Sequence, residues 1–189
     1  MAVERSVQNR SAAVQGRVFV ALWPHEGIAR QIALAAATLV GRAGGRPVHP
    51  RDLHLTLAFL GPLSPARLED AIGAVSTIAH PAIEIPLGRF GCFRRAGVLW
   101  LAPRARPVGL VELHSVVSAR LLEAGFAAER RPFKPHITLA RRNRPIRSQQ
   151  LEPPIEWRAE TLVVATSIPG ASEPPRYRHL ETIELGRRH

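Results

Sequence analysis

Two short tracts in this sequence repeat the same chemically active residues at the same spacing. Residues 54–58 read His-Leu-Thr-Leu-Ala, and residues 136–140 read His-Ile-Thr-Leu-Ala. With 8 His and 7 Thr among 189 residues, random placement gives roughly 0.3 His-x-Thr triplets in the whole chain. Both tracts also follow an Arg-Pro pair, at residues 46–47 and 131–132. We interpret the two tracts as related parts of one paired site.

The spacing within each tract suits acid-base chemistry on a phosphate. Side chains alternate across a strand, so His54 shares a face with Thr56, and His136 shares a face with Thr138. The ordinary histidine pKa is about 6.5, so one imidazole can be neutral while the other is protonated, as hydrolysis of a cyclic phosphodiester requires. The threonine hydroxyls can donate hydrogen bonds to phosphoryl oxygens. This chemistry requires no metal and no cofactor.

Charged residues close to the two tracts are further candidates. Lys134 lies two residues before His136 and Arg141 follows the second tract, so both are candidate substrate-binding residues for a phosphate. Asp52 lies two residues before His54, where its carboxylate can orient the imidazole or help to hold a metal. For Asp52 we favour a loop position facing water.

Aromatic side chains and the remaining histidines give weaker signals. Aromatic rings can stack on a terminal base, although most aromatics in a chain of this size belong to the core. The candidates for stacking are Phe19, Phe59, Phe133, Trp100 and Trp157. His114 falls on the apolar stripe of an expected helix and is predicted to be partly buried. No pattern supports a role for His25, His49, His80, His179 or His189.

The charge of the chain favours an anionic partner. The formal net charge is +11 and the sequence pI is about 11.6, which favours RNA, DNA or nucleotides. However, all the basic residues except Lys134 are arginine, a bias that genome composition also produces. The hydrophobic content of 46% and the mean hydropathy of −0.03 fit one globular domain. We expect a single domain at residues 17–189 after a flexible tail at residues 1–16.

The compartment is predicted from cysteine usage and from apolar runs. Cys92 is the single cysteine, which excludes an intrachain disulfide and a Cys-x-x-Cys zinc site and suits a reducing environment. Residues 1–16 lack the apolar run of a signal peptide. The longest apolar tract, residues 32–40, is far shorter than the ~20 residues that span a bilayer. We therefore expect a cytoplasmic protein without a membrane segment.

Periodicity and turn residues predict the elements that position the two tracts. Ser64 and Pro65 are typical of a helix start. A basic segment at residues 94–97 divides two apolar stretches, as in a hairpin. The expected strands are residues 17–23, 53–60, 82–93, 97–102, one at the second tract, 160–168 and 177–185, and the expected helices are residues 24–40, 65–78 and 108–124. These elements predict an α+β protein of two lobes that meet at a cleft.

Three stretches of the chain resemble the 2H phosphoesterase superfamily, and specifically its RNA 2′,3′-cyclic phosphodiesterase branch, formerly described as 2′-5′ RNA ligases. They are residues 54–61 (HLTLAFLG), residues 131–141 (RPFKPHITLAR) and, more loosely, residues 89–91 with 98–100. The resemblance extends over about residues 17–185. It implies a bilobal, pseudo-symmetric α+β fold with two antiparallel-rich sheets flanking a central cleft and helices on the outer faces.

The resemblance also implies an activity and a role for each site residue. It implies metal-independent hydrolysis of an RNA 2′,3′-cyclic phosphate end to a 2′-phosphomonoester. We further expect a monomer, with 2′-5′ ligation as the reverse reaction. His54 would be the proton donor to the leaving oxygen, and His136 the proton acceptor that activates water. Thr56 and Thr138 would bind the phosphate.

Two other functions stay open at this point. A non-catalytic RNA or nucleotide binding protein could keep the same cleft. A metal hydrolase could use His54 and His136 with Asp52 as ligands.

Overall fold

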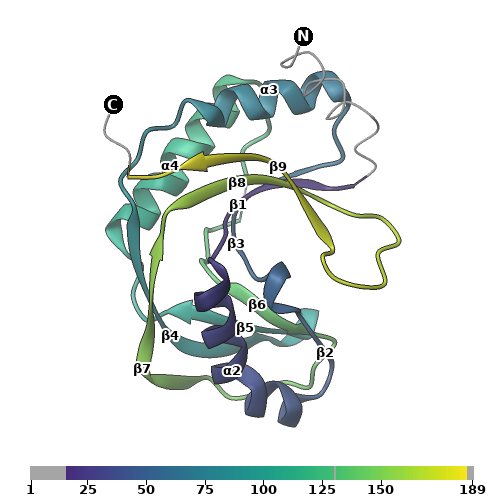
Figure 1. The fold of residues 1–189 in the computed structure, drawn as a ribbon, viewed down its shortest axis with the longest axis vertical. Coiled ribbons are helices and arrows are strands. Elements are labelled where there is room, and N and C mark those ends of the chain that lie inside the picture. The colour runs from purple at the N-terminus through teal and green to yellow at the C-terminus, as the bar shows by residue number, and fades with distance from the viewer. Residues whose placement is uncertain (1–15, 130, 187–189) are drawn as a thin grey trace.

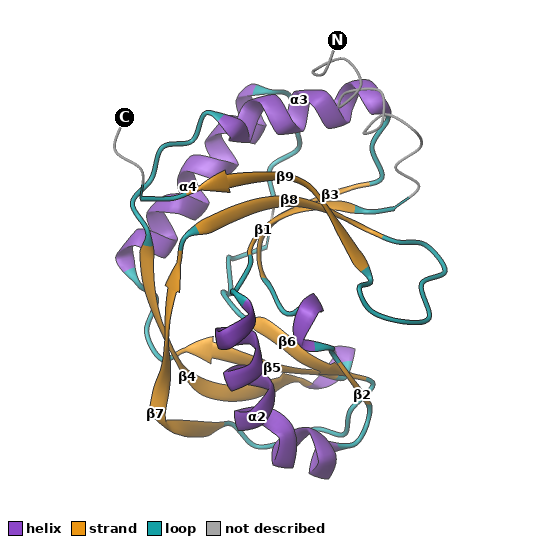
Figure 2. Cartoon of the chain, in the orientation of Figure 1, coloured by secondary structure: helices purple, strands orange, loops and turns teal. Residues whose placement is uncertain are grey.

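The computed structural model describes residues 16–129 and 131–186. Within these ranges the chain forms one antiparallel sheet of nine strands and three α-helices (Figures 1 and 2). The strands are β1 (Val18–Leu22), β2 (Arg46–Pro47), β3 (Leu55–Gly61), β4 (Ile83–Phe93), β5 (Val98–Pro103), β6 (Ile137–Arg141), β7 (Gln149–Ala159), β8 (Thr161–Ser167) and β9 (Tyr177–Glu184). The helices are α2 (Glu26–Ala43), α3 (Pro65–Ser76) and α4 (Val108–Glu123).

The sheet consists of two groups of strands that meet at a single residue pair. The strand order is β7-β4-β5-β6-β3-β1-β8-β9, with β2 paired to β6. Between β6 and β3 the register contains only the pair Leu55 and Ile137. We call β3, β1, β8 and β9 the first lobe, and β7, β4, β5, β6 and β2 the second lobe. Leu55 and Ile137 each directly follow a motif histidine, so the lobes meet at the paired site.

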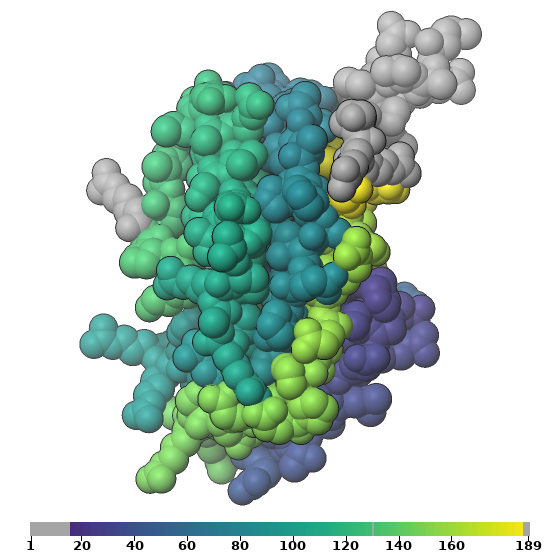
Figure 3. Space-filling model, turned by 90° about the vertical axis from the view of Figure 1, so that its left-hand side faces the viewer, coloured from purple at the N-terminus to yellow at the C-terminus, as the bar shows by residue number. Residues whose placement is uncertain are grey.

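Two of the helices contact strands of the lobe that they do not follow in the chain. Helix α2 follows β1 of the first lobe, yet it contacts β6 and β7 of the second lobe. Helix α4 follows β5 of the second lobe and contacts β3 and β4, and on the outer side of the molecule it lies against α3 (Figure 3). The expected α+β architecture of two lobes with outer helices is confirmed, but each lobe takes elements from both halves of the sequence.

Alternation along β1 separates two faces of the first lobe. Val18, Val20 and Leu22 join the main core beneath the helices, while Phe19 and Ala21 form a second apolar cluster with β8. We call the side that carries Phe19 and Ala21 the inner face. A strand that is buried on both faces consists of a continuous run of apolar residues, and β1 has such a run.

The helix starts follow the expected capping chemistry. The Ser64 hydroxyl accepts from the backbone N–H of Arg67 at 3.4 Å, and Pro65 occupies the first turn of α3. Helix α2 ends before Gly44, whose φ of 66° suits glycine. These helices and α4 lie close to their expected bounds.

Two strands were not expected from the sequence. Strand β7 contains Pro153 and Pro154, which argue against a strand because proline donates no backbone hydrogen bond. Because β7 lies at the edge of the sheet, the missing donors are tolerated there. The short strand β2 falls in the segment expected to be a loop.

Two further expectations concern the N-terminal tail and membrane-spanning segments. The flexible tail at residues 1–16 lies outside the described residues, apart from Gly16. In the part of the chain that the structure describes, no helix has the length and apolar character needed to cross a membrane.

Candidate functional site

The same backbone irregularity follows each histidine tract. On β3, Leu57 has no partner on β1, because Ala21 pairs with Thr56 while the preceding residue of β1, Val20, pairs with Ala58. On β6, Leu139 likewise has no partner, because the register with β5 skips it. Each is a β-bulge at the residue after the motif threonine, and a bulge redirects the side chains that follow it.

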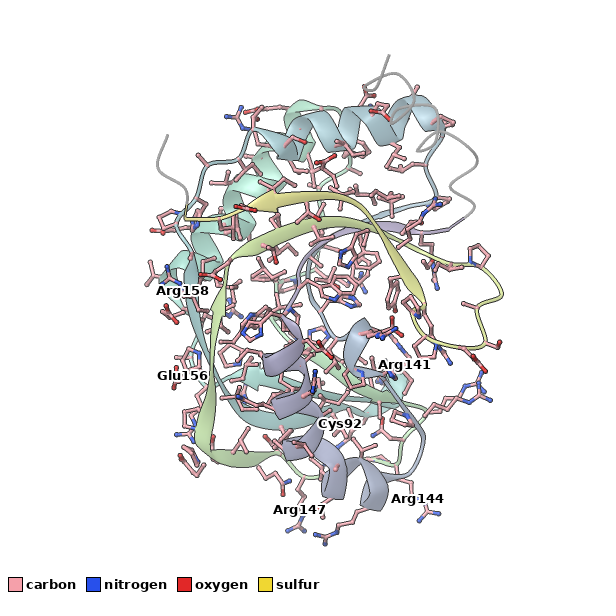
Figure 4. All side chains as sticks on the ribbon, viewed as in Figure 1. Cys92, Arg141, Arg144, Arg147, Glu156 and Arg158 are labelled. Atoms are coloured by element: carbon pink, nitrogen blue, oxygen red, sulfur yellow. The ribbon has the colours of Figure 1, made fainter. Side chains whose placement is uncertain are left out.

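The bulges turn the residue five positions after each histidine to the inner face. In the first lobe this residue is Phe59, which is 65% exposed and lies 6.3 Å from the Phe19 ring. In the second lobe it is Arg141, which is exposed at the junction of the lobes (Figure 4). The positive charge of Arg141 lowers the pKa of both His54 and His136, so its guanidinium lies within electrostatic reach of both rings.

Both imidazoles are oriented by the backbone carbonyl two residues earlier. Nδ1 of His54 donates to the Asp52 carbonyl at 2.7 Å, and Nδ1 of His136 donates to the Lys134 carbonyl at 2.7 Å. A carbonyl only accepts, so each Nδ1 carries the hydrogen and Nε2 keeps the lone pair in the neutral ring. The two Nε2 lone pairs are therefore available to take up a proton.

The expectation that Asp52 faces water is wrong. Asp52 is 2% exposed, and its Oδ1 accepts from the backbone N–H of Arg176 at 2.9 Å. Its Oδ2 is buried and has no hydrogen-bond partner among residues 16–129 and 131–186. The reason is that Asp52 ends the short helix η1 (Pro50–Asp52) and its carboxylate bonds to the segment just before β9. The carbonyl of Asp52, rather than its carboxylate, orients His54.

In the first lobe His54 is enclosed by aromatic rings. Its ring stacks on Phe19 and Trp23, with centroid distances of 4.9 Å and 4.8 Å, and meets the edge of Tyr177 at 4.9 Å. The ring of His179 in turn lies 4.3 Å from that of Trp23. Burial is the main reason that the pKa of His54 falls to about 4. His54 is therefore neutral at pH 7 in the free protein.

In the second lobe the surroundings of His136 are more open. Phe93 meets the His136 ring edge-on at 4.9 Å, and Trp100 lies 5.6 Å from Phe93. Burial again lowers the pKa of His136, opposed by the hydrogen bond to the Lys134 carbonyl. His136 and the side chain of Lys134 both line a groove on this lobe.

The stacking candidates have different positions. Phe19 contacts His54, Trp100 lies beside Phe93, and Phe59 is exposed. Trp157 is fully buried in the core. Phe133 stacks on His114 at 3.9 Å, and burial lowers the pKa of that histidine, so the prediction that His114 is partly buried is confirmed.

Sequence reasoning missed four aromatic residues of the site: Trp23, Phe93, Tyr177 and His179. Trp23 had a usable signal, because it continues the alternation of Phe19 and Ala21 along β1. Tyr177 and His179 reach the site through the pairing of β9 with β8, which no local pattern predicts.

The described residues contain no group of three or more His, Cys, Asp or Glu side chains that could hold a metal ion. The Asp52 carboxylate, the third ligand of the metal-hydrolase alternative, bonds instead to the backbone of Arg176. The donor set thus does not match that of a catalytic zinc site, which takes three protein ligands.

Comparisons with known proteins give consistent results. The family model described as "2'-5' RNA ligase superfamily" matches residues 24–167. The chain is 38% identical over 126 residues to the RNA 2′,3′-cyclic phosphodiesterase of Escherichia coli, covering 66% of this chain and 71% of that protein. It is 32% identical over 167 residues to the Thermus thermophilus protein of the same name, covering 80% and 81%.

Solved structures share the fold as well. The crystal structure of E. coli LigT complexed with 3′-AMP has a TM-score of 0.81 and 29% identity, covering 91% of this chain and 99% of that one. The structure of E. coli LigT complexed with ATP has a TM-score of 0.78 and 28% identity, covering 91% and 99%.

Proposed function

The chain belongs to the 2′-5′ RNA ligase superfamily, and on this premise we propose that it hydrolyses RNA 2′,3′-cyclic phosphate ends to 2′-phosphomonoesters without a metal. The observation that carries the proposal is the pairing of two imidazoles. Each is oriented by the carbonyl two residues earlier, and the charge of His136 lowers the pKa of His54, which supports their action on one phosphate. The names of the relatives support the substrate class.

His136 is the proton acceptor of the proposed mechanism. Its Nε2 lone pair takes the proton from the water that attacks phosphorus. His54 is the proton donor to the leaving ribose oxygen. Burial keeps His54 neutral in the free protein, so in this mechanism it takes up its proton together with the anionic substrate, whose charge raises the pKa of the imidazole.

The proposed phosphate ligands come from both lobes. The hydroxyls of Thr56 and Thr138 donate to non-bridging oxygens, where positioned donors stabilise the charge that grows in the transition state. Arg141 neutralises the phosphate between the lobes, and its influence on the pKa of both histidines supports this position. Lys134, exposed beside His136, attracts the RNA.

The proposal also includes the domain organisation, the oligomeric state and the compartment of the enzyme. We propose that residues 17–189 act as one bilobal domain, as a monomer in the cytoplasm, with 2′-5′ ligation as the reverse reaction at high concentrations of RNA ends. The nucleotides named in the structures of E. coli LigT, 3′-AMP and ATP, support an RNA or nucleotide substrate.

The test is incubation of the protein with a short RNA that carries a 2′,3′-cyclic end, in the presence of a chelator. The expected product is the 2′-phosphomonoester, identified by its resistance to a 3′-specific phosphatase. RNA binding without turnover would instead indicate a binding protein. Activity that the chelator abolishes and a divalent ion restores would indicate a metal hydrolase.

A further inference from the structure

A groove on the second lobe begins beside His136. Its volume is about 280 Å³, near the lower end of the range for small-molecule sites. It lies between the inner face of β4 and β5 and the segments that follow β5 and precede β6. Besides His136, the side chains that matter here are Arg89, Arg106, Lys134, Phe93 and Trp100. Among the described residues that line the groove there is no carboxylate.

Three cations of the groove are available to a ligand. Arg89, Arg106 and Lys134 are exposed, and none has an ion-pair partner within residues 16–129 and 131–186. Arg104 differs, because its guanidinium pairs with Glu152 and donates to the Leu151 carbonyl at 2.8 Å. The three unpaired cations can therefore neutralise phosphates, whereas Arg104 holds β7 in place.

The aromatic rings of Trp100 and Phe93 connect these cations to His136. The Trp100 ring covers Gly91, where a Cβ atom would lie 2.2 Å from the indole. The Arg89 guanidinium lies 5.5 Å from the centre of the Trp100 ring, and Phe93 bridges Trp100 to His136. Aromatic faces beside cations are typical of sites that bind single-stranded nucleic acid.

We propose that this groove binds the phosphodiester that lies directly upstream of the cyclic phosphate, so that RNA ends are preferred over cyclic mononucleotides. The inference rests on the proposed function. A cyclic mononucleotide carries one phosphate, and the two histidines and Arg141 take it. A longer RNA carries a second phosphate, which reaches Arg89 and Arg106. On the inner face of the first lobe, the described cluster of Phe19, Ala21, Val163 and Ala165 is apolar and supplies no cation.

The test compares kcat/KM for a trinucleotide with a 2′,3′-cyclic end against kcat/KM for a 2′,3′-cyclic mononucleotide. For the wild-type protein this ratio should exceed one. Arg89→Ala and Arg106→Ala should each lower the ratio by roughly 5- to 10-fold, as expected for one lost charged contact. The matched control is Arg42→Ala, an exposed arginine outside the groove, which should leave the ratio unchanged. A wild-type ratio near one, or a ratio that neither groove variant changes, would overturn the proposal.

A binding measurement separates this inference from the proposed function. If the wild-type protein hydrolyses no cyclic phosphate, the proposed function fails, but the groove remains testable with a 3′-phosphorylated trinucleotide and fluorescence anisotropy. Each groove variant should weaken trinucleotide binding and lower the salt slope, the change of log K with log salt, by about 0.7. An equal loss of affinity for a 3′-phosphorylated mononucleotide would place these arginines at the terminal phosphate and contradict the inference.

Discussion

The two lobes orient their histidines in the same way but surround them differently. In both, a carbonyl two residues earlier holds Nδ1, and a bulge follows the threonine. In the first lobe His54 contacts Phe19, Trp23 and Tyr177, whereas in the second lobe His136 contacts Phe93 and borders an open cationic groove.

The two lobes thus give their histidines the same orientation but different pKa values. Repeating the backbone arrangement gives two equivalent Nε2 atoms, but equivalent pKa values would leave the proton donor and acceptor undefined. The aromatic cluster of the first lobe desolvates His54 and lowers its pKa to about 4. Pairs of groups whose surroundings separate their pKa values are typical of acid-base sites. In the free protein this difference keeps His54 neutral, so the donor role proposed for His54 depends on the proton that it takes up with the anionic substrate.

Replacing either histidine should have the largest effect. His54→Ala and His136→Ala should each lower kcat for a cyclic-phosphate RNA by about 10² to 10⁴, because each removes one proton transfer. The double variant should be little worse than either single variant, since the two groups act as a unit. Wild-type kcat/KM should be bell-shaped in pH, and each single variant should lose one limb.

The control for this prediction is His80→Ala, because His80 lies in a connecting segment after α3 and its ring bonds to the neighbouring Pro81 carbonyl. Its rate and pH profile should match those of the wild type. If only one of the two motif variants lost activity, the lobes would not be catalytic equivalents and the paired mechanism would be wrong.

A smaller difference between the two histidines is expected in how the free energy of unfolding depends on pH. The pKa of His54 is about 6.5 in the unfolded chain and about 4 in the folded protein, so between these values only the unfolded chain binds the proton. Stability is therefore lost as the pH falls from about 6.5 towards 4. For His54 this amounts to about 2 kcal/mol between pH 7 and pH 5. His136, His114 and His179, whose pKa values are also lowered, act in the same direction.

Denaturant unfolding of three proteins at pH 7 and pH 5 measures this contribution. His54→Gln should reduce the pH-dependent loss of stability by about 2 kcal/mol, because glutamine does not titrate. His136→Gln should reduce it by less, since the pKa of His136 is displaced less. The same pH dependence in the wild type and in His54→Gln would show that the aromatic cluster does not desolvate this ring.

Local patterns predicted the parts of the site that depend on neighbours in sequence. Alternation placed Thr56 opposite the apolar residues of β3, and Ser64 marked the start of α3 because its cap is a local hydrogen bond. The bulges escaped prediction, since Leu57 and Leu139 are apolar and buried with or without a bulge. Only the register against a partner strand distinguishes the two cases.

Long-range packing explains the remaining misses. The enclosure of His54 brings Trp23, the residue after β1, together with Tyr177 from β9, more than 150 residues later in the chain. Strand β7 was missed because its two prolines are tolerated only at a sheet edge, and its edge position follows from the full strand order. Asp52 was assigned to water because its partner, the N–H of Arg176, lies 124 residues away.

The smallest expected effect concerns the residues two positions before each histidine. Asp52 is buried and bonds to the backbone of Arg176, the neighbour of Tyr177, whereas Lys134 is exposed. Asp52→Ala should lower kcat by roughly 3- to 10-fold and raise the pKa of His54, because the Arg176 segment loses its acceptor and water reaches the ring.

Asp52→Asn keeps the Oδ1 acceptor and should restore most of kcat, so the pair of variants separates positioning from charge. NMR titration of the His54 ring would report the pKa in each protein. Lys134→Ala leaves its carbonyl in place, so its effect should fall on KM for RNA rather than on kcat. If Asp52→Ala changed neither kcat nor the pKa of His54, the bond to Arg176 would not help to enclose the ring. The contrast between the lobes would then arise from the aromatic side chains alone.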